Sequence, residues 1–163
     1  MRRILMEKVI DTIKSFFENN DWKYNFNDED KVFSSGIDMG NILGNVRMVI
    51  LLEDNFYNVY MVMNNKVEEK YLPVVAEFLH RANYGLKDGN FEMDYRDGEI
   101  RYKSFVNFKN IDVSEEVIGE SIIVGATMID RYGKGLLKLM LGDESPEECI
   151  EFCENKEKGS MSN

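Results

Sequence analysis

Few residues in this 163-residue chain have types and spacing suited to catalysis. His80 is the single histidine and could act as a general base, but no serine or cysteine nucleophile stands beside it in a recognisable motif. At helical spacing its neighbours would be Ala76, Glu77, Asn83 and Tyr84. We therefore interpret His80 as a surface or helix-end residue and expect no catalytic residues in the chain.

The two cysteines are the next candidates for chemistry. Cys149 and Cys153 would share one face of a helix and could supply two ligands to a metal ion. A zinc site needs two more good ligands, and the sequence offers no other cysteine and one distant histidine. We interpret both cysteines as small apolar residues of a docking helix, and we expect neither a metal nor a cofactor.

Glycine-rich and acidic stretches do not form a binding motif either. A phosphate loop follows a strand and precedes a helix, whereas residues 85–90 join a helix to a strand, and residues 133–135 match no such loop. The acidic residues 28–30 are typical of a solvated turn. For Asp94 and Asp97, arginines across a hairpin already supply partners, so we expect no cation there.

The charge balance excludes several classes of partner. Thirty acidic and twenty basic residues give a formal charge of −10, which argues against binding to nucleic acid or to anionic lipid. No stretch reaches the roughly 18 apolar residues of a membrane span. Charged residues interrupt residues 4–17, so no signal peptide is predicted, and we expect a cytoplasmic protein that binds neither membranes nor nucleic acid.

Hydrophobic periodicity predicts a single α+β domain over residues 1–158, with residues 159–163 as a frayed tail. The expected helices cover residues 2–19, 68–84, 114–131, 136–141 and 146–156, with a break at 132–135. The expected strands cover residues 22–26, 32–39, 46–52 and 56–63, followed by a hairpin. This order predicts an antiparallel sheet, made of a meander plus a hairpin, with helices packed on one face.

The ends of these elements carry local signals. Ser114 and Ser145 precede acidic first turns and are predicted N-caps, and Pro73 fits only the first turn of a helix that begins near Leu72. Gly85 is a predicted left-handed cap. Residues 46–52 are nearly all apolar, which is typical of a central strand covered on both faces.

The hairpin has the strongest pattern. Asp97-Gly98 predicts a two-residue type I′ turn that would set Arg96 opposite Glu99 and Glu92 opposite Lys103. One face would then carry the apolar side chains of Phe91, Met93, Tyr95, Ile100 and Tyr102, and the other would carry three pairs of opposite charge, including Asp94 with Arg101. These pairs would specify the register of the hairpin.

Apolar side chains occur on both faces of the strand at residues 56–63. Ten methionines and eight tyrosines in one small domain suit an adaptable protein-binding surface, although simple core filling explains them as well. If helices cover one sheet face only, the other apolar face remains for a partner chain. The candidate partner surface is Phe56, Tyr57, Val59, Tyr60, Met61 and Met63.

The segments around the hairpin also resemble a known family. His80-Arg81-Ala82-Asn83-Tyr84-Gly85-Leu86, Gly89-Asn90-Phe91-Glu92-Met93-Asp94 and Asp97-Gly98-Glu99-Ile100-Arg101-Tyr102 are similar to the YbjN-like family of proposed bacterial sensory transduction regulators. Residues 128–132 and 145–148 look like its closing helices. The resemblance implies a fold like that of type III secretion chaperones, often dimeric, and no established catalytic residues.

Two functional hypotheses follow. The first is a non-enzymatic regulatory module that binds protein or peptide partners and forms a homodimer. The alternative is a small-molecule sensor or a cryptic enzyme, with an aromatic-lined pocket built from His80, Tyr84 and Tyr102.

Overall fold

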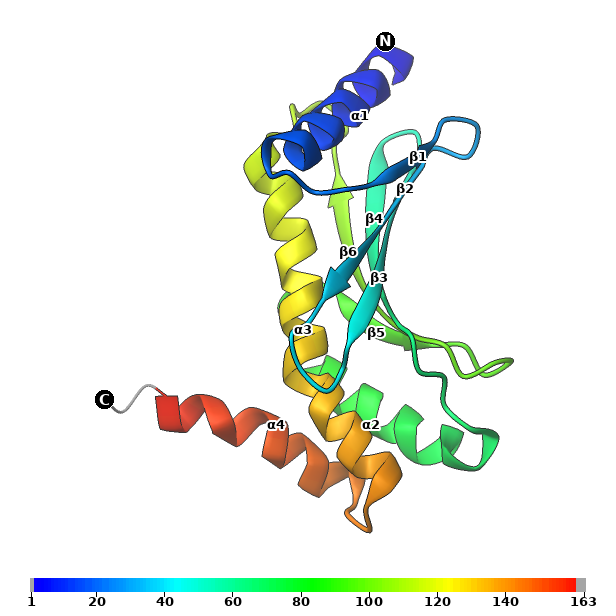
Figure 1. Cartoon of the computed structure of the whole chain (residues 1–163), viewed down its shortest axis with the longest axis vertical. Coiled ribbons are helices and arrows are strands. Elements are labelled where there is room, and N and C mark those ends of the chain that lie inside the picture. Colours follow the sequence, from blue (N-terminus) through cyan, green and yellow to red (C-terminus); the bar gives the residue numbers. More distant parts are fainter. Residues whose placement is uncertain (1, 161–163) are drawn as a thin grey trace.

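A computed structural model describes residues 2–160 as helices arranged against one antiparallel sheet (Figure 1). The helices are α1 (Arg2–Asn19), η1 (Glu69–Tyr71, a single 3-10 turn), α2 (Leu72–Tyr84), α3 (Glu115–Leu141) and α4 (Pro146–Ser160). The strands are β1 (Asn25–Asn27), β2 (Val32–Asp38), β3 (Asn45–Leu52), β4 (Phe56–Met63), β5 (Asn90–Met93) and β6 (Ile100–Asn107). None of the described helices is long and apolar enough to cross a lipid bilayer.

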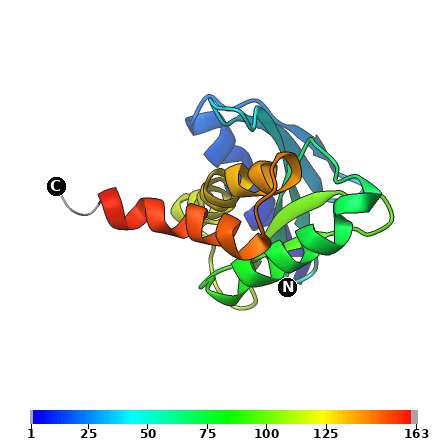
Figure 2. The same cartoon turned by 90° about the horizontal axis from the view of Figure 1, so that it is seen from below.

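The six strands lie in the order β1-β2-β3-β4-β6-β5, and every neighbouring pair is antiparallel. In Figure 1, α3 runs along one face of the sheet, with α1 at its upper end and α2 and α4 at its lower end. Figure 2 shows α4 beside α2, below the end of α3. The predicted α+β class, with helices on one face of an antiparallel sheet, is confirmed.

The core lies between the sheet and these helices. Along β3, Val46, Met48, Ile50 and Leu52 are buried, while the residues between them are more exposed. The expected cover on both faces of this strand is therefore wrong within the described chain. The buried residues of β3 face the helices. No described helix covers the other side of the sheet.

Aromatic contacts hold α1 against the start of the sheet. The Phe17 ring is fully buried, stacks on Tyr24 at 4.9 Å and lies 6.1 Å from the Phe33 ring. The predicted strand at residues 22–26 shortens to β1, because Trp22 packs edge-on against Phe17 and draws the chain toward the helix. β1 therefore covers only the first residues of β2.

A small polar cluster lies inside the core where α3 crosses β4 and β6. The hydroxyls of Tyr57 and Ser121 are 3.2 Å apart, and the Ser104 hydroxyl donates to the Ser121 carbonyl at 2.7 Å. Burial raises the pKa of Tyr57 to about 12, although the hydrogen bond to Ser121 acts in the opposite direction. These groups satisfy one another's hydrogen-bonding requirements in a site that is buried from water.

The predicted starts of α2, α3 and α4 are confirmed. Pro73 lies in the first turn of α2, and the Ser114 hydroxyl accepts from the Val117 amide at 3.4 Å. At α4 the Ser145 hydroxyl accepts from the Glu148 amide, and the Glu148 carboxylate accepts in return from the Ser145 amide. This reciprocal pair is a capping box.

The predicted break at residues 132–135 is wrong, because α3 continues through it. A Cβ on Gly133 would lie 2.9 Å from the methyl groups of Leu43, and one on Gly135 would lie 3.0 Å from the Cys149 carbonyl and overlap the Cys153 sulfur. The two glycines therefore let neighbouring segments approach the helix closely. They do not end it.

Two other predicted ends change. Gly85 follows α2 with a φ of −99°, so the predicted left-handed cap is wrong. The sequence predicts that the last helix ends at residue 156, whereas α4 extends to Ser160. Residues 159 and 160 of the predicted frayed tail therefore lie in the helix, and residues 161–163 lie outside the described part, so for them the tail stays a prediction.

The hairpin has its predicted faces but a different register. Phe91 pairs with Tyr102 and Met93 pairs with Ile100, two residues away from the predicted pairing. A shift of two residues keeps the paired side chains on their faces, since strand side chains alternate with a period of two. Phe91, Ile100 and Tyr102 therefore remain buried against the helices, as predicted. Tyr95, predicted opposite Ile100 on the apolar face, instead follows the end of β5 in the turn and is 58% exposed.

The register differs because the turn is longer than two residues. Gly98 has a φ of +74°, but Asp97 is not left-handed, so the type I′ turn does not form. Instead the Gly98 amide donates to the Asp94 carbonyl at 2.7 Å, and the Val67 amide donates to the Gly98 carbonyl at 2.9 Å. The Gly98 backbone thus docks against Val67, where a Cβ would overlap the Val67 backbone.

Candidate functional site

The side of the sheet away from the helices, here called the open face, is the candidate functional site. Registers across β2, β3, β4, β6 and β5 align its side chains in rows. Its apolar members are Val32, Val49, Leu51, Phe56, Tyr60, Val62 and Phe105, and its charged members within the strands are Asp38, Arg47, Glu92, Arg101 and Lys103. The open face therefore has an apolar end and a charged end.

Aromatic side chains dominate the apolar end. The rings of Phe56 and Phe105 lie 5.2 Å apart, and Phe105 is 52% exposed. Leu51 and Asn58 stand in the same row as Phe105. An exposed large aromatic beside partly exposed aliphatic residues favours contact with another polypeptide.

Tyr60 marks the boundary between the two ends. The Arg101 guanidinium lies 4.3 Å from the centre of the Tyr60 ring. Val62, in the next row, lies between Arg47 and Arg101 and is only 6% exposed. Arginine side chains therefore cover part of the apolar surface here while they keep their charge at its rim.

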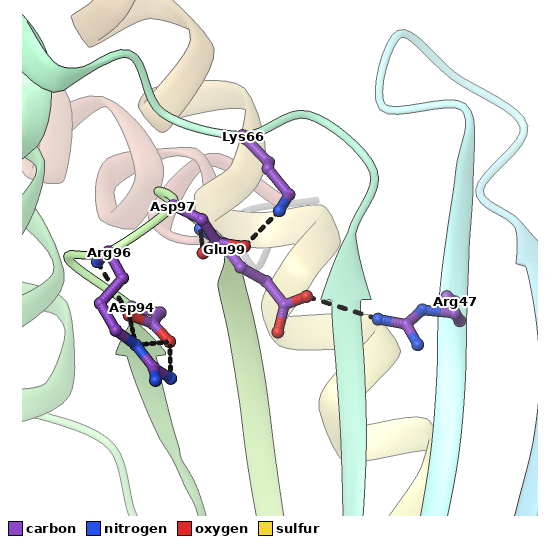
Figure 3. A network of polar contacts seen from close by, with 6 residues as sticks. All are labelled: Arg47, Lys66, Asp94, Arg96, Asp97 and Glu99. Atoms are coloured by element: carbon purple, nitrogen blue, oxygen red, sulfur yellow. Dashed lines mark hydrogen bonds and ion pairs between the residues drawn. The ribbon is translucent and has the colours of Figure 1, made fainter.

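Ion pairs fill the charged end (Figure 3). Arg47 of β3 lies 3.4 Å from Glu99, Lys66 pairs with Asp97, and Arg96 donates to Asp94 at 2.6 Å. The hydrogen bonds from the side chain and the backbone of Arg96 lower the pKa of Asp94 to about 2. Arg47 and Lys66 thus bring cations to the hairpin from other segments, while Arg96 pairs with Asp94 within the turn itself.

Glu92 links β5 to β6 in this network. Its carboxylate accepts from Lys103 and, at 2.8 Å, from Arg101. Burial alone raises the pKa of Glu92, but the hydrogen bonds from Lys103 and Arg101 outweigh it and lower the pKa below its ordinary value.

Of the three predicted ion pairs, the structure keeps Glu92 with Lys103 and changes the partners of Asp94 and Glu99. Glu92 does contact Lys103, but Arg101 stands opposite it. Asp94 bonds Arg96, not Arg101. Glu99 bonds Arg47, not Arg96, because the longer turn moves Arg96 away from the position across from Glu99.

The predicted partner surface is divided by the fold. Tyr57, Val59, Met61 and Met63 point toward the helices and are at most 6% exposed, so they form core and not surface. Phe56 and Tyr60 lie on the open face. Alternation along β4 separates the two groups, and the positions of the helices decide which group is covered.

The alternative pocket is not assembled. His80 is exposed on α2, Tyr84 is 94% exposed, and Tyr102 is fully buried with its hydroxyl donating to the Asp88 carbonyl. Burial raises the pKa of Tyr102 to about 12, and the Asp88 charge adds to this effect. Such different exposures place the three side chains in different environments, so they do not line a common cavity.

The cysteines take part in packing. Cys149 and Cys153 are buried between α4 and α3, and burial raises the pKa of Cys149 and raises that of Cys153 to about 11. A thiol with a raised pKa is a poor nucleophile at neutral pH. Within residues 2–160, no group of three or more histidine, cysteine or acidic side chains is placed to hold a metal ion.

Three residues of the open face were missed by sequence reasoning. Continued alternation past residue 103 would have placed Phe105 on this face. Arg47 interrupts the apolar run of β3, which indicates a solvent-facing position. No sequence signal indicated Lys66, because its pairing with Asp97 depends on the docked hairpin turn.

Comparison with known proteins agrees with this fold. The sequence profile of the YbjN family, described as "Putative bacterial sensory transduction regulator", matches residues 10–138. The chain belongs to the YbjN family. No curated protein sequence matches it significantly.

A solved YbjN structure has a similar fold. "Crystal structure of YbjN, a putative transcription regulator from E. coli" aligns with a TM-score of 0.54 and 13% identity, over 74% of this chain and 84% of that one. At this identity the likeness shows the fold alone. The family description is consistent with a regulatory module.

Proposed function

We propose that this YbjN-family chain is a regulatory protein that acts through protein contacts without a catalytic step, and that its open face binds a second copy of the chain. The observation that carries the proposal is the uncovered apolar end, with Phe56 and Phe105 in contact and Phe105 half exposed. The raised thiol pKa values and the exposed His80 give no support to catalysis.

Charge favours a second copy as the occupant. The chain as a whole carries −10, so two copies repel over most of their surfaces. On the open face, by contrast, Glu92 and Glu99 are matched by neighbouring arginines and lysines, and Asp38 lies at the end of β2, away from the apolar end. Two such balanced faces can meet, apolar end against apolar end, in a symmetric dimer without unpaired like charges.

Sedimentation velocity of the full chain tests the proposal. We expect a dimer for the parent chain and a monomer for Phe105→Glu, because a carboxylate in the apolar contact would be desolvated without a partner. Ile123→Glu is the matched control: Ile123 is 63% exposed on α3, so the same charge is added away from the open face, and the dimer should persist.

Two outcomes would overturn the proposal. One is a parent chain that stays monomeric up to hundreds of micromolar. The other is equal dissociation by the two glutamate variants. Circular dichroism of both variants must match the parent, which separates loss of dimerisation from loss of folding. Tyr60→Ala provides a second, uncharged variant of the open face should Phe105→Glu unfold.

A further inference from the structure

We propose that the outer edge of β2 binds an extended acidic segment of another protein, which adds to the sheet as a new strand. This inference rests on the proposed function only in taking the protein as a protein-binding regulator. It concerns the sheet edge beside the charged end of the open face, with which it shares Arg47: a hollow of about 760 Å³ lined by Trp22, Lys23, Ser35, Gly36 and Arg47 among others.

The edge of β2 is only half covered. β1 pairs with Val32, Phe33 and Ser34, whereas β2 continues to Asp38 in its pairing with β3. In the described chain no strand lies outside the last residues of β2, and Gly36 and Asp38 are exposed. Figure 1 shows the segment before β1 leaving the sheet toward α1.

Backbone groups of β2 are directed to this edge. The Trp22 indole N–H donates to the Gly36 carbonyl at a long distance of 3.4 Å, so that carbonyl points outward. In an antiparallel strand the N–H of a residue points to the same side as its carbonyl. Gly36 therefore offers an incoming strand both a donor and an acceptor, the latter held only by a weak side-chain contact.

The opposite edge of the sheet is closed. The Asn83 side chain accepts from the Phe91 amide at 2.7 Å and donates to the Phe91 carbonyl at 3.0 Å, so it occupies the outward backbone groups at the centre of β5. Side chains that block an edge in this way prevent strand addition. The β2 edge has no comparable amide clamp among its described contacts, which makes it the edge suited to accept a strand.

The lining of the hollow selects for acidic segments. It contains two cations, Lys23 and Arg47, and no carboxylate, although the chain carries ten more acidic than basic residues. Arg47 already pairs with Glu99 at 3.4 Å and the exposed Asp38 lies two residues beyond Gly36, so the preference for an acidic segment rests mainly on Lys23. A Cβ added at Gly36 would meet nothing within 4 Å, so an incoming side chain has room beside the strand. Glutamates at alternate positions would all face the same side, toward these cations.

Trp22 gives a direct readout because it is the single tryptophan of the chain and lines the hollow. The probe is the capped peptide acetyl-Thr-Glu-Val-Glu-Val-Glu-Thr-amide, titrated into the full chain while Trp22 emission is recorded. We expect a saturable change for this peptide, and none for the same peptide with lysine in place of each glutamate. A version with N-methyl groups on alternate residues should also fail, since it lacks the donors of one strand edge.

Lys23→Glu should weaken binding of the peptide at least about tenfold, the effect of losing one attraction and adding one repulsion. Lys87→Glu is the matched control, since Lys87 is exposed and outside the hollow, and its affinity should stay within about twofold of the parent. Both lysines are exposed, so the substitutions should leave folding intact.

No change in Trp22 emission at millimolar peptide would overturn the proposal. Equal weakening by both glutamate variants would overturn the assigned site, and equal binding of the N-methylated peptide would overturn strand addition. Failure here is distinguishable from failure of the dimer, because the titration can be run on the monomeric Phe105→Glu chain. Binding by that variant supports an edge site that does not require the dimer contact at Phe105.

Discussion

The two faces of β4 carry large aromatic and aliphatic side chains, but one face packs against the helices and the other faces solvent. Tyr57 and Met61 pack against α3 and are fully buried, whereas Phe56 and Tyr60 point to the open face and keep part of their surface in water. The comparison shows that when apolar side chains lie on both faces of a strand, either face could pack into the core. Only the helices of the same chain decide which face becomes core.

The strongest way to sharpen this comparison is Met61→Ala. Met61 is fully buried, and its side chain approaches Gly125 of α3 so closely that a Cβ there would lie 2.7 Å from it. We expect a loss of about 2–5 kcal/mol in the free energy of unfolding, from lost burial and the cavity left behind. Urea unfolding followed by circular dichroism measures it, and a loss below 1 kcal/mol would contradict the placement of Met61 in the core.

A smaller effect on the same face is expected for Tyr57→Phe. The change removes a buried hydroxyl that lies 3.2 Å from the Ser121 hydroxyl, while Ser121 keeps its own bond to the Ile118 carbonyl. Because no donor is left unpaired, the cost should be about 1 kcal/mol. The same urea titration tests this, with Tyr60→Phe as the control at a hydroxyl outside the core.

On the open face, Glu92→Gln should have a modest, pH-dependent effect. The folded chain lowers the pKa of Glu92 below its ordinary value of 4.5, so the ionised form stabilises the fold above that pH, and this contribution disappears as the pH falls through the lowered pKa. We expect a loss below about 1 kcal/mol at pH 7. Unfolding curves from pH 7 to pH 3 should converge for parent and variant, and a constant difference would point to lost packing instead.

A similarly small effect on stability is expected for Tyr60→Ala at protein concentrations where the chain is monomeric. Tyr60 contacts Arg101 through its ring but has no helix above it, so the loss should be about 1 kcal/mol or less. If Tyr60→Ala costs as much as Met61→Ala, the open face is not solvent-facing and the comparison fails. Thermal unfolding of the two variants side by side gives the answer.

The helix starts were predicted correctly because they depend on local chemistry. Ser114 and Ser145 cap helices as expected, because a hydroxyl before an acidic first turn satisfies free backbone amides wherever it stands. The candidate surface was predicted less well. Alternation grouped Phe56 and Tyr60 with Val62, but it could not show that the opposite group, including Met61, would be covered by α3.

The sequence by itself determined the α+β class, the helix starts and the face on which each paired hairpin residue lies, since these follow from periods of 3.6 and 2 and from caps a few residues long. Tertiary structure decided the register and the continuity of elements. The hairpin turn is longer than its Asp97-Gly98 pair predicts because Gly98 docks on Val67. α3 passes through Gly133 and Gly135 because Leu43 and Cys153 pack where side chains would stand. A glycine permits a stop, a turn or a close approach, and only the neighbours that the fold brings to it select among them.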